Sequence, residues 1–124
     1  MLHQQKQQFL LEKLEYLKTK TMSDKVDDEA MKQIITLAMN NDPAFLVKFQ
    51  ETHQVFIQKL MERAPNLVTT DLAMCAHLRL GFYTKEIARY TKLSVRAVEG
   101  KKYRIRKKLD IPATEDLNVW MMQV

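Results

Sequence analysis

Residues 101–108 contain six basic side chains, and this run is the segment of the sequence with the clearest chemical meaning. The six are Lys101, Lys102, Arg104, Arg106, Lys107 and Lys108. Basic runs of this density are typical of surfaces that bind the phosphate groups of a polyanion. A solvated helix face explains an isolated basic run equally well, so the residues around it have to decide between the two.

The excess of positive over negative charge lies entirely in the second half of the chain. The sequence has 124 residues and a net charge of +5. Residues 1–62 hold 8 Lys and Arg against 9 Asp and Glu, whereas residues 63–124 hold 12 against 6. The net charges of the two halves are therefore −1 and +6, and any polyanion is expected to bind the second half.

Side chains that could catalyse a reaction or bind a metal are few and scattered. His3, His53 and His77 lie far apart, and Cys75 is the single cysteine. Cys75 and His77 are two positions apart, which places them on different faces of a helix. The sequence has no glycine-rich phosphate loop and no isolated carboxylate pair. We expect no catalytic residue, no metal site, no cofactor and no enzymatic activity, with Cys75 as a small core residue.

The composition predicts an all-α protein. The length favours one domain, or a small domain with an appendage. Glycine (2) and proline (3) are scarce, while residues that favour helices are abundant. No segment has the roughly 20 uninterrupted apolar residues of a membrane span, and the first residues lack the apolar region of a signal peptide. We therefore expect a soluble, cytoplasmic protein.

The first predicted helix, from about Gln4 to Lys20, carries a short apolar seam. Leu10, Leu14 and Leu17 have the spacing of a coiled coil. The helix is polar and barely two heptads long, so it needs a partner. We expect the seam to contribute to a homodimer, and folding of the seam back onto residues 26–60 is the alternative.

Two further helices complete the N-terminal segment. The second is expected to begin with Ser23 or Asp24 as its N-cap and to end at about Met39. The third is expected to run from Pro43 to about Arg63, with an apolar stripe of Phe45, Phe49, Phe56 and Leu60. The domain boundary follows it, which gives a helical linker or dimerisation segment at residues 1–63 and a second domain at 64–124.

The second domain contains two helices joined by a short turn. A helix over about 70–80 ends at Gly81, whose freedom at positive φ suits a C-cap. A short helix over 84–91, a three-residue turn and a longer helix over 95–109 follow, with Ser94 as the cap of the last. A basic second helix after such a turn is the helix-turn-helix arrangement.

The helix over 95–109 has two different sides. The side expected to face the protein carries Val98, Ile105 and Leu109, with Val95 nearby. The opposite side carries Arg96, Gly100, Tyr103 and Lys107, flanked by Arg104.

Two residues on that opposite side suggest contact with bases. A glycine inside a helix costs about 1 kcal/mol relative to alanine, and a close approach of DNA to Gly100 would explain it; neutral drift is the alternative. Tyr103, one turn on, is placed to contact a base edge, a thymine methyl or a phosphate. Packing of Tyr103 on the last helix of the domain is the alternative.

Three segments resemble the LuxR-type helix-turn-helix family. They are LRLGFYTKEIA at 78–88, LSVRAVE at 93–99 and YRIRKKL at 103–109, and the similarity extends without a gap over about residues 66–112. It is closest to a bacterial subgroup in which this domain ends longer signalling proteins with tetratricopeptide repeats or sensor domains. The resemblance implies a four-helix domain that binds double-stranded DNA as a dimer, with the helix from Ser94 in the major groove.

The resemblance also assigns contacts by matched position. Glu99, Gly100 and Tyr103 would meet bases. The DNA backbone would be met by Arg96, Lys101, Arg104 and Lys107. Thr84 and Lys85, at the start of the preceding helix, are counted with the same DNA-binding surface.

Departures from the family pattern concern mainly helix ends. Val68 and Tyr83 stand where the family usually has a capping Thr and a capping Ser, and we expect the threonines that follow them to cap instead. Lys92 replaces a frequent turn glycine, which places a side chain in a left-handed position at a cost of order 1 kcal/mol. No departure removes a positive charge.

The sequence therefore predicts a transcription regulator that binds specific DNA sequences as a dimer. The alternative is a helix-turn-helix retained as a protein-interaction or dimerisation module, in which the helices of residues 1–63 do the main work. No receiver domain is evident, so we expect an input signal to come from an upstream sensor domain or a partner protein.

Overall fold

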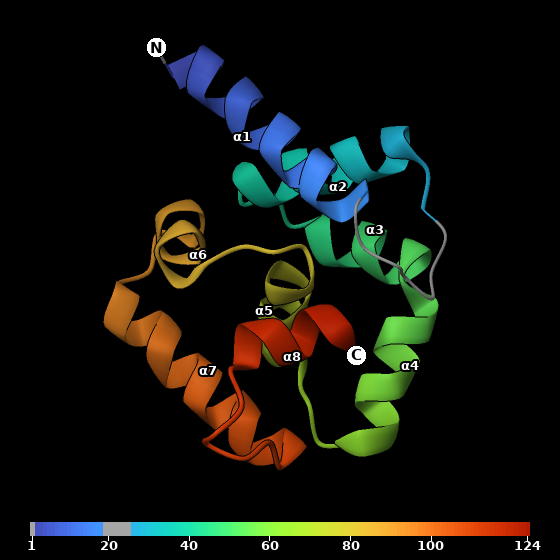
Figure 1. Cartoon of the computed structure of the whole chain (residues 1–124), viewed down its shortest axis with the longest axis vertical. Coiled ribbons are helices and arrows are strands. Elements are labelled where there is room, and N and C mark those ends of the chain that lie inside the picture. The colour runs from blue at the N-terminus through green and yellow to red at the C-terminus, as the bar shows by residue number, and fades with distance from the viewer. Residues whose placement is uncertain (1, 19–25) are drawn as a thin grey trace.

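Helices are the only regular secondary structure among the residues that the structure describes. The computed structural model describes residues 2–18 and 26–124, and in α1 the side chains of residues 5 and 7–15. Within these ranges there are eight helices and no strand, which confirms the all-α class. In chain order (Figure 1) they are α1 (Leu2–Lys18), α2 (Asp28–Met39), α3 (Phe45–Thr52), α4 (Gln54–Arg63), α5 (Thr69–Arg79), α6 (Thr84–Thr91), α7 (Val95–Leu109) and α8 (Leu117–Gln123).

Helix α5 occupies the centre of the molecule, with α8 crossing in front of it and α6 and α7 to one side in Figure 1. It packs against α3, α7 and α8. Its buried residues are Leu72, Met74, Cys75, Ala76, His77, Leu78 and Arg79. Buried side chains of the first half, such as Ile34, Phe49 and Leu60, belong to the same core. The core is thus continuous across the expected boundary at residue 64, and the division into 1–63 and 64–124 stays a prediction.

The start of α2 differs from the expectation. Asp27 is the N-cap, because its Oδ1 accepts a hydrogen bond of 2.7 Å from the backbone N–H of Ala30. The helix therefore begins at Asp28, and the expected caps Ser23 and Asp24 lie outside the described residues.

The expected third helix is in fact two helices, α3 and α4, which meet at His53. At that residue the backbone leaves the helical region, with φ −122° and ψ 48°. The Thr52 hydroxyl lies 3.1 Å from the carbonyl oxygens of Lys48 and Phe49, to which it donates, and the His53 ring stacks on Phe49 with centroids 4.1 Å apart. This local bonding ends α3 without a glycine or a proline, so the prediction of one continuous helix was wrong.

The connections on either side of α6 agree with the sequence pattern. Gly81 has φ 83° and follows the end of α5, which begins and ends one residue earlier than expected. Both α6 and α7 have the expected bounds. The Ser94 Oγ accepts a hydrogen bond of 3.0 Å from the Ala97 N–H, and Lys92 has a left-handed φ of 59°.

The starts of α5 and α6 correct the expectation that a neighbouring threonine caps each helix. The N-caps are Val68 and Tyr83, and neither uses its side chain. Their backbone N–H groups instead donate to carboxylates three residues later, Val68 to Asp71 Oδ2 at 3.0 Å and Tyr83 to Glu86 Oε1 at 2.8 Å. An acidic residue in the first turn thus compensates for the missing hydroxyl.

Replacement of Lys92 by glycine is expected to stabilise the protein by about 1 kcal/mol, because glycine adopts a left-handed φ without a clash at Cβ. Urea denaturation of the variant measures the change. Asn41→Gly is the matched control, since Asn41 has φ 50° but asparagine tolerates this region better than lysine. An equal or larger gain from the Asn41 variant would contradict the explanation.

His77 is a polar residue within the apolar core. Its side chain is 6% exposed and its ring lies 4.6 Å from that of Phe45 and 5.5 Å from that of Phe82. The ring Nδ1 donates a hydrogen bond of 2.8 Å to the Ala73 carbonyl. Burial disfavours the charged form and lowers the pKa of His77 from 6.5 to about 4.

Protonation should therefore oppose folding at low pH. Because the pKa in the folded chain lies below the unfolded value, the stabilising contribution is complete above about pH 6.5 and is lost as the pH falls toward 4. This group should lower the free energy of unfolding by about 3 kcal/mol between pH 7 and pH 4. Urea denaturation at several pH values tests this, with His77→Leu expected to have a flatter profile; parallel profiles would exclude His77 as the cause.

Candidate nucleic-acid interface

Helix α7 is fixed by its inner face. Val98, Ile105 and Leu109 are fully buried, and the helix packs against α6 and α5. These three residues face the protein as expected. Val95 does not, because it lies in the first turn of α7, beyond the core, and is 40% exposed.

Three of the six basic residues in 101–108 form hydrogen bonds within the chain. The Lys102 Nζ donates to Asn118 Oδ1 at 2.6 Å and to Thr84 Oγ1 at 3.0 Å. The Arg106 Nη1 donates to two carbonyl oxygens of the loop before α8, those of residues 112 and 115, at 2.8 and 2.7 Å. The Lys108 Nζ forms an ion pair of 2.6 Å with Asp71 on α5. These bonds connect α7 to α5, α6 and α8.

Burial and hydrogen bonding shift the pKa values of two of these groups. Burial would raise the pKa of Asp71, but hydrogen bonds from Lys108 and from the Val68 N–H outweigh it, so the pKa lies below 3.8. Burial also lowers the pKa of Lys102 from its ordinary value. The low pKa keeps Asp71 ionised at neutral pH, which favours its ion pair with Lys108.

The outer face of α7 has a different composition. Arg96, Glu99, Arg104 and Lys107 are exposed, and Gly100 and Lys101 are half-buried. Tyr103 is 60% exposed, and the Lys107 Nζ lies 5.3 Å from the centre of its ring. This exposure argues against the alternative that Tyr103 packs on the last helix. We call the group formed by these seven residues the outer face of α7.

Gly100 lies in the middle of this face, and the fold does not require a glycine there. A Cβ atom at this position would meet the Arg104 Nη1 at 3.6 Å, which is an ordinary contact. The residue is inside a regular helix and is absent from the positive-φ positions. Nothing in the folded chain therefore explains why a residue with low helix propensity stands here.

The start of α6 lies beside this face. Thr84 is half-buried and accepts the hydrogen bond from Lys102, while Lys85 is exposed. Both residues line an open hollow of about 630 Å³, together with Lys102 of α7 and Asn118 and Val119 of α8. Thr84 and Lys85 were predicted as part of the DNA-binding surface from the family resemblance, whereas Lys102, which joins the start of α6 to α7, was not.

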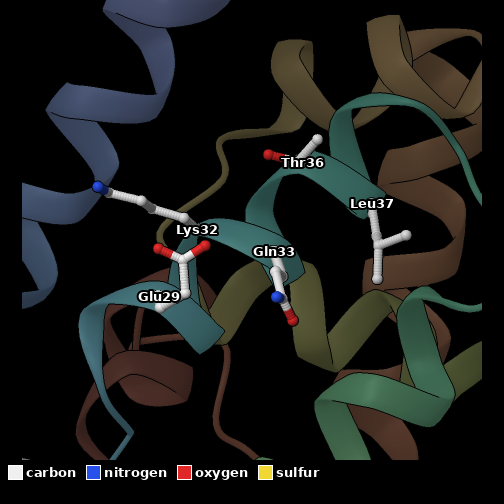
Figure 2. A pocket seen from close by; sticks show the side chains of 5 residues that line it. All are labelled: Glu29, Lys32, Gln33, Thr36 and Leu37. Atoms are coloured by element: carbon white, nitrogen blue, oxygen red, sulfur yellow. The ribbon is translucent and has the colours of Figure 1, made fainter.

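A second hollow, of about 380 Å³, lies along α2. Figure 2 shows its lining side chains, which are Glu29, Lys32, Gln33, Thr36 and Leu37. All five come from α2, and among the described residues no other element contributes a lining side chain. The arrangement does not suggest a binding or catalytic site.

The described residues contain no group of three His, Cys, Asp or Glu side chains that could hold a metal ion. Cys75 is buried, and burial raises the pKa of its thiol to about 12, which makes it a poor nucleophile. It packs in the core, as expected for a small apolar residue. His3 lies in the part of α1 whose side chains are not described.

The leucine seam of α1 is partly used within the chain. Leu14 is 6% exposed and belongs to the core, and Leu10 packs against that core. Helix α1 contacts α2. The side chain of Leu17 lies outside the described residues. Leu10 and Leu14 thus pack within their own chain, as the alternative to a dimer expects. A role of the seam in a homodimer stays a prediction.

Comparisons with known proteins returned no match to a family model, to a curated protein or to a solved structure. Across the described residues, no helix is both long and apolar enough to span a membrane. The LuxR-type resemblance therefore depends on the quoted segments of the sequence.

Replacement of Gly100 by alanine is expected to raise the free energy of unfolding by up to about 1 kcal/mol, because the new methyl group fits and alanine favours the helix. Thermal or urea denaturation measures this. Gly81→Ala is the contrasting variant, since φ 83° at that position makes an alanine strained. A destabilised Gly100 variant would mean that the fold itself requires the glycine.

Proposed function

We propose that this protein binds specific sequences of double-stranded DNA and regulates transcription, with α6 and α7 as a LuxR-type helix-turn-helix. The main support for the proposal is that some basic residues of α7 bond within the chain while others are exposed on its outer face. Lys102, Arg106 and Lys108 hold α7 in place through bonds within the chain. The basic residues of the outer face are not explained by the folding of the chain, so a ligand of opposite charge is the simplest reason for them.

The outer face of α7 suits the major groove. That groove is about 12 Å wide and admits an α-helix. Gly100, at the middle of the face, would let the helix backbone approach the base edges closely. Tyr103 and Glu99 would then meet bases, while the flanking cations Arg96 and Arg104 would meet phosphates.

The start of α6 would contact the DNA backbone. The backbone N–H groups in the first turn of a helix favour an anion, and the exposed Lys85 lies there. The bond from Lys102 to Thr84 holds this turn against α7. The start of α6 would therefore contact the phosphates while α7 lies in the groove, with the two helices held in a fixed relative position.

A homodimer is part of the proposal. One domain of this size contacts few base pairs, so two copies would place their α7 helices in successive major grooves about 34 Å apart. Leu14 could contact a second copy only if α1 left its present position, because it is buried within its own chain. An upstream sensor domain or a partner protein would supply the signal.

Charge reversal at Arg104 and Lys107, both to Glu, tests the proposal. Both side chains are exposed, so the helical content and melting temperature should change little. Binding to duplex sites selected from random DNA should be lost at moderate salt. Titration at several salt concentrations should show a slope for the unchanged protein near −0.9 per phosphate contact.

Lys32→Glu combined with Lys59→Glu is the matched control, because it changes the net charge equally at exposed residues of α2 and α4. It should bind the selected DNA nearly as well as the unchanged protein. If the Arg104 and Lys107 variant retains its affinity, α7 does not contact DNA, and the domain is better explained as a protein-interaction module.

A further inference from the structure

Helix α1 is attached to the α5–α6 junction through a buried ammonium group. Lys13 is 7% exposed, and its Nζ donates to the Gly81 carbonyl at 2.6 Å and to Glu86 Oε1 at 3.0 Å. Lysine is rarely buried unless it is paired. Both partners lie about 70 residues further along the chain, so this pairing depends on the docking of α1.

Aromatic rings surround the same contact. The Lys13 Nζ lies 4.8 Å from the ring centre of Tyr83 and 5.5 Å from that of Phe82. Phe9, one turn earlier in α1, lies 5.2 Å from the ring of Phe82 and 5.2 Å from that of Tyr90. Helix α1 therefore contacts both ends of α6, through Tyr83 before its first residue and Tyr90 in its last turn.

The ion pair acts on the group that caps α6. Glu86 Oε1 accepts the N–H of Tyr83, which is the N-cap of this helix, and it also accepts the Lys13 ammonium. Helix α6 has eight residues, a length at which an isolated helix is marginal in water. The docking of α1 thus adds support to a helix that needs it.

Four described side chains of α1 take part in its docking. Among the described side chains of α1, Lys13 and Leu14 are buried, Phe9 and Leu10 are half-buried, and the others are exposed. If α1 undocked, water would solvate the freed ammonium group. A segment of a fold can open separately at a free energy below that of global unfolding, so undocking of α1 need not unfold the core.

No described contact of α1 reaches the outer face of α7. The described contacts of α1 are with α2, the α5–α6 junction and the Phe82 and Tyr90 rings, and in Figure 1 α1 lies at the opposite end of the molecule from the end of α7. Docked α1 therefore supports α6 without covering the face proposed to bind DNA.

We propose that α1 is a detachable strap, held by the contact of Lys13 with Gly81 and Glu86, that fixes α6 and so raises the DNA affinity of α7. The effect on DNA rests on the proposed function, whereas the effect on α6 does not. An input that pulls α1 away would lower DNA affinity, and by linkage bound DNA would favour the docked strap.

Hydrogen exchange of backbone amides tests the strap without DNA. Lys13→Met keeps most of the side-chain volume but removes the charge, and the amides of α6 should then exchange about tenfold faster, as expected for loss of hydrogen bonds to a charged group. Amides in the middle of α5 should be unchanged. Lys32→Met, at an exposed residue of α2, is the matched control and should leave both helices unchanged.

Glu86→Gln is the second variant, in case the methionine is not tolerated. Its amide oxygen can still accept the Tyr83 N–H, but the charge that attracts Lys13 is gone. In the double variant, the effects of the two changes should not add, because each removes the same pair. Unchanged exchange of α6 in both single variants would overturn the strap.

Binding of a selected DNA duplex tests the second half of the proposal. The Lys13 and Glu86 variants should bind about tenfold more weakly than the Lys32 control, and saturating DNA should slow exchange of α6 in the unchanged protein. Faster exchange of α6 with unchanged DNA affinity would overturn the link to DNA. If even the unchanged protein binds no duplex, the proposed function fails, and the exchange experiment still decides whether α1 is a strap.

Discussion

The burial of α5 is the constraint on which the other helices depend. Seven of its residues are buried, and two of these are polar, so their hydrogen bonds have to be formed inside the protein. His77 donates to Ala73 in the same helix. Arg79 donates through Nη1 to the carbonyl oxygens of residues 121, 122 and 124.

The bonds of Arg79 fix the end of α8, and its guanidinium group lies 5.0 Å from the ring centre of Phe56 on α4. On another side of α5, Asp71 holds Lys108 of α7. One short helix therefore sets the positions of elements from both halves of the sequence. The orientation of α7 follows from these contacts together with its own buried face.

The sequence predicted α6, the turn and α7 well because strong local signals mark their ends. Gly81 has no Cβ atom and so adopts its positive φ without strain, and the Ser94 hydroxyl caps the first turn of α7. The first half lacks such signals. The break between α3 and α4 depends on the hydroxyl of Thr52 and the packing of His53 on Phe49, and neither residue type marks a helix end in a sequence.

The candidate interface was predictable in position but not in detail. The helical period separated Val98, Ile105 and Leu109 from the outer face, because that separation depends on α7 alone. The division among the basic residues depends on partners in other elements, such as Asn118 and Asp71, which a single-helix analysis does not contain. The role of Lys13 was not predictable for the same reason, because its partners Gly81 and Glu86 lie about 70 residues further along the chain.

The residues of α7 that bond within the domain differ from those of its outer face, and this separation has a consequence for protein engineering. Residues 102, 106 and 108 bond to the rest of the domain, while residues 96, 99, 100, 103, 104 and 107 lie outside the core. The scaffold and the ligand preference are thus encoded by different residues of the same 15-residue helix. A library that randomises the second group alone would sample new binding specificities on one unchanged framework.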